Sequence, residues 1–167
     1  MKKKICFLIY DLRTGGAENM VSQISNELSD EFDITILLIN YKNNYKNYLN
    51  SKIIVKNLNI IKISHSLKSL FNIFLKNKYD IVFSNIWPIT IISSFLLFFN
   101  RKTKLVLIEH SILIDQFNMN KTIFIRILKY ISVLIFYNLA NKVIAVSNAT
   151  KNSLLRLGVK EKKIVVI

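Results

Sequence analysis

Lys4–Ile24 reads KICFLIYDLRTGGAENMVSQI, and this stretch decides the fold. Its first part is an apolar run of strand length that ends at Asp11, and a short loop with Gly15 and Gly16 follows. A helical pattern then begins at Ala17. A strand, a glycine turn and a helix N-terminus, in this order, are typical of the first unit of an open parallel α/β sheet.

The turn at Gly15 and Gly16 has two properties that suit an anionic ligand. The first backbone N–H groups of a helix have no partner within the helix, and the helix dipole is positive there. Glycine has no Cβ, so a ligand can approach the backbone closely. A plain tight turn, in which Glu18 accepts bonds from the first-turn amides, explains the same residues. The two glycines alone leave both interpretations open.

The rest of the chain alternates between strand-like and helix-like segments. Short, mostly apolar runs predict strands, and the continuous β-branched run of Asp33–Ile39 predicts a strand that is buried on both faces. These runs are Asp33–Ile39, Lys52–Leu58, Tyr79–Ser84, Lys104–His110, Lys142–Val146 and Lys163–Ile167. Apolar residues at helical spacing predict helices over Ser64–Lys78, Ile89–Phe99, Lys121–Asn141 and Ala149–Leu157. The alternation with short connections predicts an α/β fold with a doubly wound parallel sheet.

Finer expectations follow from the same patterns. Ile89–Phe99 is apolar nearly all round, so we expect this helix to be buried. Tyr41–Ser51 is polar and rich in asparagine, which favours a solvated linker over a ligand-binding lid, and a second loop holds Asp115 and Asn118. His65 has no second metal-type ligand nearby in the sequence, so we expect a capping or exposed side chain there.

Composition limits the class of protein. The chain has 167 residues, of which 51% are hydrophobic, and one proline, so we expect a single domain with a sizeable core. The single cysteine, Cys6, excludes an internal disulfide and fits a reducing compartment. The run after Lys2–Lys4 is interrupted by Asp11 before a signal peptide is complete, and no stretch is long and apolar enough for a spanning helix. These features predict a cytoplasmic location.

The charge balance is strongly basic, with 24 Lys and Arg against 10 Asp and Glu and a formal net charge of +14. Nucleic acid, an anionic membrane surface and phosphate-bearing substrates are the partner classes that such a balance suits. The lysines are scattered over loops and helix faces, and no nucleic-acid-binding motif is present, so we expect no nucleic acid partner.

Ligands of doubly wound sheets bind beyond the carboxyl ends of the strands. The polar residues expected there are Asp11 to Glu18, Asn85 and Trp87, Glu109 and His110, and Ser147 and Asn148. His110 is the sharpest candidate, because imidazole donates or accepts a proton near neutral pH. A histidine that only bonds the loop backbone, Glu109 as a brace of that loop and Ser147 as a helix N-cap are the structural alternatives.

Several kinds of chemistry lack their residues. The glycine pair forms neither G-x-G-x-x-G nor a P-loop, so a dinucleotide cofactor is not indicated. The sequence has no G-x-S-x-G motif and no Cys/His cluster of metal-binding spacing, so we expect no metal.

Four short motifs, taken together and in this order, resemble the N-terminal domain of family-4 retaining glycosyltransferases. They are GGAE at Gly15–Glu18, DIVFS at Asp80–Ser84, Glu109–His110 at the end of a strand, and VIAVSNATK at Val143–Lys151. The resemblance covers essentially the whole chain. It implies that residues 1–167 form one Rossmann-like half of a GT-B fold, in which two such domains face each other across a cleft.

The resemblance also implies roles. This half would bind mainly the acceptor, with Gly15 and Gly16 near the diphosphate and sugar of the donor and His110 at the reaction centre. Other candidate substrate-binding residues are Glu18, Asn85, Trp87, Glu109 and Ser147. The implied partners are a nucleotide sugar and a glycan or polyprenyl-diphosphate-linked acceptor of bacterial surface polysaccharide synthesis, with no cofactor and no metal.

Two further expectations come with this resemblance. Peripheral contact with the inner face of the cell membrane is implied, with Ser64–Lys78 and Lys121–Asn141 as the candidate surface. The family's donor-binding C-terminal domain, with its paired glutamates, is not among the 167 residues. We therefore expect a truncated, split or excised half with little or no transferase activity alone. A non-catalytic basic module that binds an anionic membrane surface or nucleic acid is the alternative.

Overall fold

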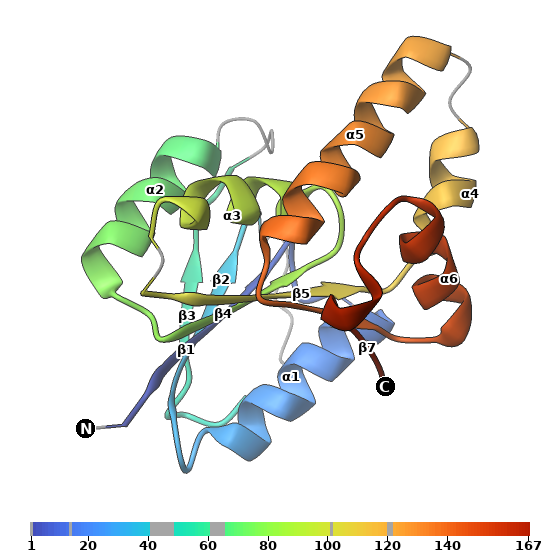
Figure 1. The fold of residues 1–167 in the computed structure, drawn as a ribbon. Helices are drawn as coiled ribbons and strands as arrows, with labels where there is room; N and C mark the ends of the chain where they lie inside the picture. Colours follow the sequence, from blue (N-terminus) through green and yellow to red (C-terminus); the bar gives the residue numbers. More distant parts are fainter. Residues whose placement is uncertain (1, 14, 41–48, 61–65, 101, 120–121) are drawn as a thin grey trace.

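The computed structural model describes residues 2–13, 15–40, 49–60, 66–100, 102–119 and 122–167. The described residues form one parallel sheet in the order β3-β2-β1-β4-β5-β6-β7 (Figure 1). The strands are β1 Lys4–Ile9, β2 Asp33–Leu38, β3 Ile54–Asn57, β4 Ile81–Asn85, β5 Lys104–Glu109, β6 Lys142–Ala145 and β7 Ile164–Val166. The strand order reverses between β1 and β4. The predicted doubly wound parallel sheet is therefore confirmed.

The sheet lies between layers of helices. The helices are α1 Gly16–Leu28, α2 Ser66–Asn77, α3 Ile89–Phe98, α4 Leu113–Asn118, α5 Ile123–Leu139 and α6 Asn148–Arg156. Figure 1 shows α2, α3 and α5 on one side of the sheet and α1 on the other, with α5 extending beyond the layer. None of the described helices combines the length and the apolar composition that crossing a bilayer requires.

Two apolar cores explain why the central strand β1 is continuously apolar after Lys4. Cys6 and Leu8 of β1 face the core under α2, α3 and α5, whereas Ile5, Phe7 and Ile9 face the core under α1. Successive side chains of a strand point to opposite faces, so a strand covered on both sides needs apolar residues at every position. Cys6 is fully buried as expected, and burial raises the pKa of its thiol, which keeps the thiol protonated and unreactive.

One expected loop is a helix. Residues Leu113–Asn118 form α4, although we expected a loop around Asp115 and Asn118. Leu113, Ile114 and Phe117 have helical spacing and are buried, so burial of this face stabilises a helix that is too short to show a clear period in the sequence.

The expectation that Ile89–Phe99 would be buried is wrong for its outer face. Phe95 and Phe98 are nearly half exposed and Phe99 is 72% exposed, because the described residues cover α3 only from the sheet and from α2 and α5. The apolar residues of α2 divide in the same way, with Leu70 and Phe74 buried and others exposed. His65 and most of the expected linker Tyr41–Ser51 lie outside the described residues.

Candidate functional site

The predicted site residues follow strands that are neighbours in the sheet. β1, β4, β5 and β6 are adjacent and parallel, so their carboxyl ends lie along one edge. The register places Ser84 of β4 opposite Leu8 of β1 and Leu107 of β5. The residues that follow Ile9, Asn85, Glu109 and Ala145 are therefore at the same edge, as a doubly wound sheet requires of a ligand site.

Asn85 connects β1 to His110. Its fully buried side chain donates from Nδ2 to the Leu8 carbonyl oxygen at 3.2 Å, and its Oδ1 lies 3.4 Å from Nε2 of His110. Because Oδ1 can only accept, Nε2 of His110 carries the proton in this pair, and Nδ1 is left as an acceptor. This contact therefore favours the tautomer of His110 with the proton on Nε2.

Burial also sets the charge of this imidazole. His110 is half-buried, and the loss of hydration lowers the pKa of its imidazole below the ordinary value of histidine. A lowered pKa makes the neutral ring the dominant form at neutral pH. Such a ring contacts a ligand through hydrogen bonds and carries no net charge.

Glu109 braces the turn that carries His110. This carboxylate is fully buried. Its Oε1 accepts bonds from the backbone N–H of His110 at 3.1 Å and of Ser111 at 3.2 Å, and from the Ser111 hydroxyl at 2.8 Å. Its Oε2 accepts a bond from the Tyr137 hydroxyl at 2.6 Å. Burial raises the pKa of Glu109, and these bonds act in the opposite direction.

Trp87 lies in an aromatic cluster beneath a cation. Its ring meets Phe117 edge-on with centroids 5.1 Å apart, and Nζ of Lys129 lies 5.0 Å from the Trp87 centroid. The buried indole Nε1 has no hydrogen-bond partner among the described residues.

The residue before Trp87, Ile86, has a φ of 63°, a conformation that costs a β-branched residue about 1–3 kcal/mol. Such strain is concentrated at functional sites in proteins.

The glycine turn has an open side. Gly15 is the N-cap of α1 with an extended φ of −162°, so the turn does not need the left-handed conformation that favours glycine. A Cβ on Gly15 would clash with Oε2 of Glu18, whose side chain folds over this glycine. A Cβ on Gly16 would meet nothing within 4 Å in the part of the chain that the structure describes. Packing of these described residues therefore gives no reason for glycine at position 16.

Ser147 is the N-cap of α6, as predicted. Its Oγ accepts a bond from the backbone N–H of Thr150 at 3.1 Å, and Ser147 lies after β6 at the same edge of the sheet.

The Asp11 carboxylate is turned toward its own loop, where its Oδ2 pairs with Nε of Arg13 at 2.6 Å. Among the described residues, no three or more His, Cys, Asp or Glu side chains form a group that could hold a metal ion.

Tyr137 and Thr90 are site residues that sequence reasoning missed. Both are fully buried, Thr90 in α3 beside the buried Ser93 and Ser94 and Tyr137 in the largely apolar α5, and the Tyr137 hydroxyl connects Thr90 to Glu109. A hydroxyl in an apolar helix needs a buried partner, and this is the signal that could have identified them.

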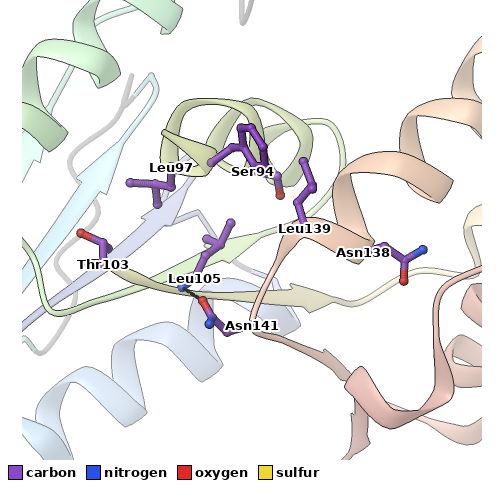
Figure 2. A pocket seen from close by; sticks show the side chains of 8 residues that line it. Ser94, Leu97, Thr103, Leu105, Asn138, Leu139 and Asn141 are labelled. Carbon is purple, nitrogen blue, oxygen red and sulfur yellow. Dashed lines mark hydrogen bonds between the residues drawn. The ribbon is translucent and has the colours of Figure 1, made fainter. Parts of the chain in front are cut away.

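A hollow of about 430 Å³ lies at the opposite edge of the sheet, near the amino end of β5 (Figure 2). It is lined by Ser94, Leu97, Phe98, Thr103, Leu105, Asn138, Leu139 and Asn141. None of these side chains titrates, and Oδ1 of Asn141 already accepts a bond from the Leu105 N–H. The hollow therefore lacks an acid or base, and the carboxyl edge remains the candidate site.

The lowered pKa of His110 gives a testable prediction. In the folded chain, NMR titration of the His110 imidazole should have a midpoint below about 6.5, the ordinary value of histidine. The unfolded state then binds this proton more tightly than the folded state. The free energy of unfolding therefore decreases as the pH falls through the pKa that His110 has in the unfolded chain. His110→Gln identifies the resonance, and the urea-unfolded chain is the reference. A midpoint at or above the unfolded value would contradict the burial described here.

Comparison with solved structures identifies the fold. HepE from Anabaena in complex with UDP has a TM-score of 0.76 and 21% identity, over 98% of this chain and 43% of that one. Sucrose-phosphate synthase from Thermosynechococcus elongatus has a TM-score of 0.72 and 12% identity, with coverages of 99% and 48%. The apo form of the lipopolysaccharide outer core galactosyltransferase WaaB has a TM-score of 0.62 and 16% identity, over 98% of this chain and 44% of that one.

This chain thus spans less than half the length of these structures and has the Rossmann-like fold of the N-terminal half of GT-B enzymes. UDP-N-acetylglucosamine 2-epimerases share the fold, so the fold alone does not define the reaction. No curated protein matches the sequence significantly. The model of Glycosyltransferase Family 4, however, matches residues 14–167, which is nearly the whole chain. The chain belongs to Glycosyltransferase Family 4.

Proposed function

We propose that this chain is the acceptor-side half of a glycosyltransferase, which transfers a sugar from a nucleotide sugar to a glycan or lipid-linked acceptor. The observation that carries the proposal is family membership over residues 14–167, in a fold that brings the α1 N-terminus and His110 to one edge of the sheet. HepE was solved with UDP and with UDP-glucose, and WaaB is a lipopolysaccharide galactosyltransferase. Both support a nucleotide-sugar donor and a surface-glycan product.

The chemistry of the edge suits such a transfer. Negative charge develops on the diphosphate as its bond to the sugar breaks, and the unpaired N–H groups and positive dipole end of α1 stabilise an anion there. The open side of Gly16 lets a phosphate reach this backbone. The neutral imidazole of His110 supplies Nδ1 as a hydrogen-bond acceptor for a sugar hydroxyl. For an anion to bind, the Glu18 carboxylate must move away from Gly15.

Donor binding needs more surface than this edge offers. The related structures are more than twice as long as this chain, and the family resemblance places most donor contacts in a second domain. We infer that transfer requires this chain together with such a donor-binding domain. This chain contributes the acceptor surface, the helix N-terminus and His110.

The outer surface of the α2–α3–α5 layer supports a lipid-linked acceptor. Exposed large apolar side chains gather on all three helices, at Leu67, Phe71, Leu75, Phe95, Phe98, Ile123, Phe124, Ile125, Ile127, Leu128, Ile131, Leu134, Ile135 and Leu139. The sequences of these helices contain no Asp or Glu, and their charged residues are Lys68, Lys76, Arg126 and Lys129. An apolar surface with only positive charges fits the headgroup region of an anionic bilayer.

Gly16→Ala tests the proposed approach of the donor. The new Cβ meets nothing within 4 Å among the described residues, so stability should be unchanged or slightly higher, whereas the KM for the nucleotide sugar should rise because the methyl group occupies the path of the ligand. The measurement is sugar transfer by the chain joined to a donor-binding domain. In the same assay His110→Ala should lower kcat/KM by about 100-fold or more.

Asn152→Ala, an exposed change on α6, is the control and should transfer at the unmodified rate. An unaltered KM for Gly16→Ala would contradict the ligand approach at the turn. Full activity of His110→Ala would contradict the role given to the imidazole.

Vesicle co-sedimentation tests the membrane surface. The chain should bind vesicles of phosphatidylcholine with phosphatidylglycerol, bind phosphatidylcholine alone more weakly, and lose the difference at high salt. The double change Phe124→Ser and Leu128→Ser should weaken binding by about 100-fold or more, since each inserted side chain contributes about 1.5–3 kcal/mol and about 1.4 kcal/mol corresponds to a factor of ten. Val55→Ser with Val165→Ser, two comparably exposed residues on edge strands, should bind normally.

If the Phe124→Ser and Leu128→Ser double variant binds vesicles as tightly as the unmodified chain, that result would contradict the proposed membrane surface. Self-association in solution with no vesicle binding would assign the apolar layer to a second copy of the chain. Vesicle binding by a protein that never transfers sugar, even with a donor-binding domain, would favour the non-catalytic basic module. Binding of DNA in a parallel assay would contradict the expected absence of a nucleic acid partner.

A further inference from the structure

A buried polar chain runs from two helices of the outer layer to the site. Thr90 of α3, Tyr137 of α5 and Glu109 at the end of β5 are each fully buried. The Thr90 Oγ1 and the Tyr137 hydroxyl oxygen are 3.0 Å apart, and the Tyr137 hydroxyl oxygen is 2.6 Å from Oε2 of Glu109. Of these three hydrogen-bonded residues, Glu109 lies at the carboxyl edge of the sheet, and Thr90 and Tyr137 lie in helices.

The direction of the bonds is fixed. A phenol has one proton, and Tyr137 donates it to Glu109, so Thr90 donates to the Tyr137 oxygen. The backbone carbonyl of Thr90 also accepts bonds from the hydroxyls of Ser93 and Ser94, which hold the first turn of α3. The hydroxyls of Thr90 and Tyr137 therefore both donate in the direction of the carboxylate, whereas those of Ser93 and Ser94 donate to the helix backbone.

The two carboxylate oxygens of Glu109 accept hydrogen bonds from different parts of the structure. Oε2 contacts α5 through Tyr137, whereas Oε1 holds the backbone N–H groups of His110 and Ser111 and the Ser111 hydroxyl. A carboxylate is planar and rigid, so a rotation that frees one oxygen also displaces the other. The position of the His110 turn thus depends on a bond made by α5.

We propose that Tyr137 is a positioning residue of this site, supported by Thr90, and that it sets the location of His110 through Glu109. The effect on sugar transfer rests on the proposed function, whereas the effect on the His110 environment does not. Tyr137 also joins α5, which carries most of the exposed large apolar side chains described in this layer, to the turn that carries the imidazole.

The proposal differs from simple packing in what Tyr137→Phe removes. Phenylalanine keeps the buried ring, so the fit of α5 against the core is retained, but Oε2 of Glu109 loses its donor. A buried carboxylate oxygen without a partner is costly, so the group rotates toward other donors or takes up a proton. Either response weakens the bonds of Oε1 to the His110 turn.

The test uses the chain joined to a donor-binding domain and measures both transfer kinetics and the NMR titration of His110. Tyr137→Phe should lower kcat by up to about 100-fold with little change in the KM for the donor, because a displaced reacting group costs rate more than binding. The midpoint of the His110 titration should rise toward its value in the unfolded chain as the ring becomes more hydrated.

Matched variants separate positioning from packing. Thr90→Val should change both readouts in the same direction by a smaller amount, and Thr90→Ser, which keeps the hydroxyl, should behave as the unmodified chain does. Tyr130→Phe is the control on the same helix, because its hydroxyl donates to Oδ1 of Asn118 at 2.8 Å and does not reach Glu109. It should leave both readouts unchanged.

Folded Tyr137→Phe and Thr90→Val variants with unchanged kcat and an unchanged His110 midpoint would overturn the proposal. If Tyr137→Phe does not fold, Thr90→Val decides by the same readouts. Absence of transfer by the unmodified protein would count against the proposed function, and the His110 titration would still decide whether Tyr137 positions the turn.

Discussion

The structure of the site depends on one buried carboxylate. Glu109 is fully buried at the end of a central strand, where an unpaired charge would cost several kcal/mol. Four donors, from the His110 and Ser111 backbone, the Ser111 hydroxyl and Tyr137, offset that cost at about 1.5–3 kcal/mol for each bond to a charged group. The same bonds fix the His110 turn. Stability of the core and geometry of the site therefore have a common origin.

The outer face of the α2–α3–α5 layer, away from the sheet, is the second feature that shapes this half of the molecule. α5 buries Val133 and Tyr137 and leaves most of its other apolar side chains exposed, and the adjacent outer surfaces of α2 and α3 are also apolar. No acidic residue interrupts these three helices. One helix thus contacts the site from inside through Tyr137 and presents an apolar, positively charged surface outside. This arrangement is compatible with the lipid-linked acceptor that we propose.

Much of the fold could be predicted from the sequence. Strands buried on both faces are continuously apolar, and the short alternating connections allow few topologies, so the parallel sheet and the carboxyl edge with Asn85 and His110 followed directly. The exposed face of α3 could not be predicted, because a helix that is apolar all round does not indicate which side is covered. The role of Tyr137 depends on contact between residues 28 positions apart, which no local pattern encodes.

Amide hydrogen exchange at His110 and Ser111 tests the central claim most directly. Both N–H groups lie beyond the end of β5, where a loop amide would exchange rapidly unless a buried acceptor held it. If Glu109 binds them as described, both amides exchange as slowly as those inside β5, and Glu109→Ala removes this protection. Rapid exchange at both positions in the unmodified protein would contradict the account.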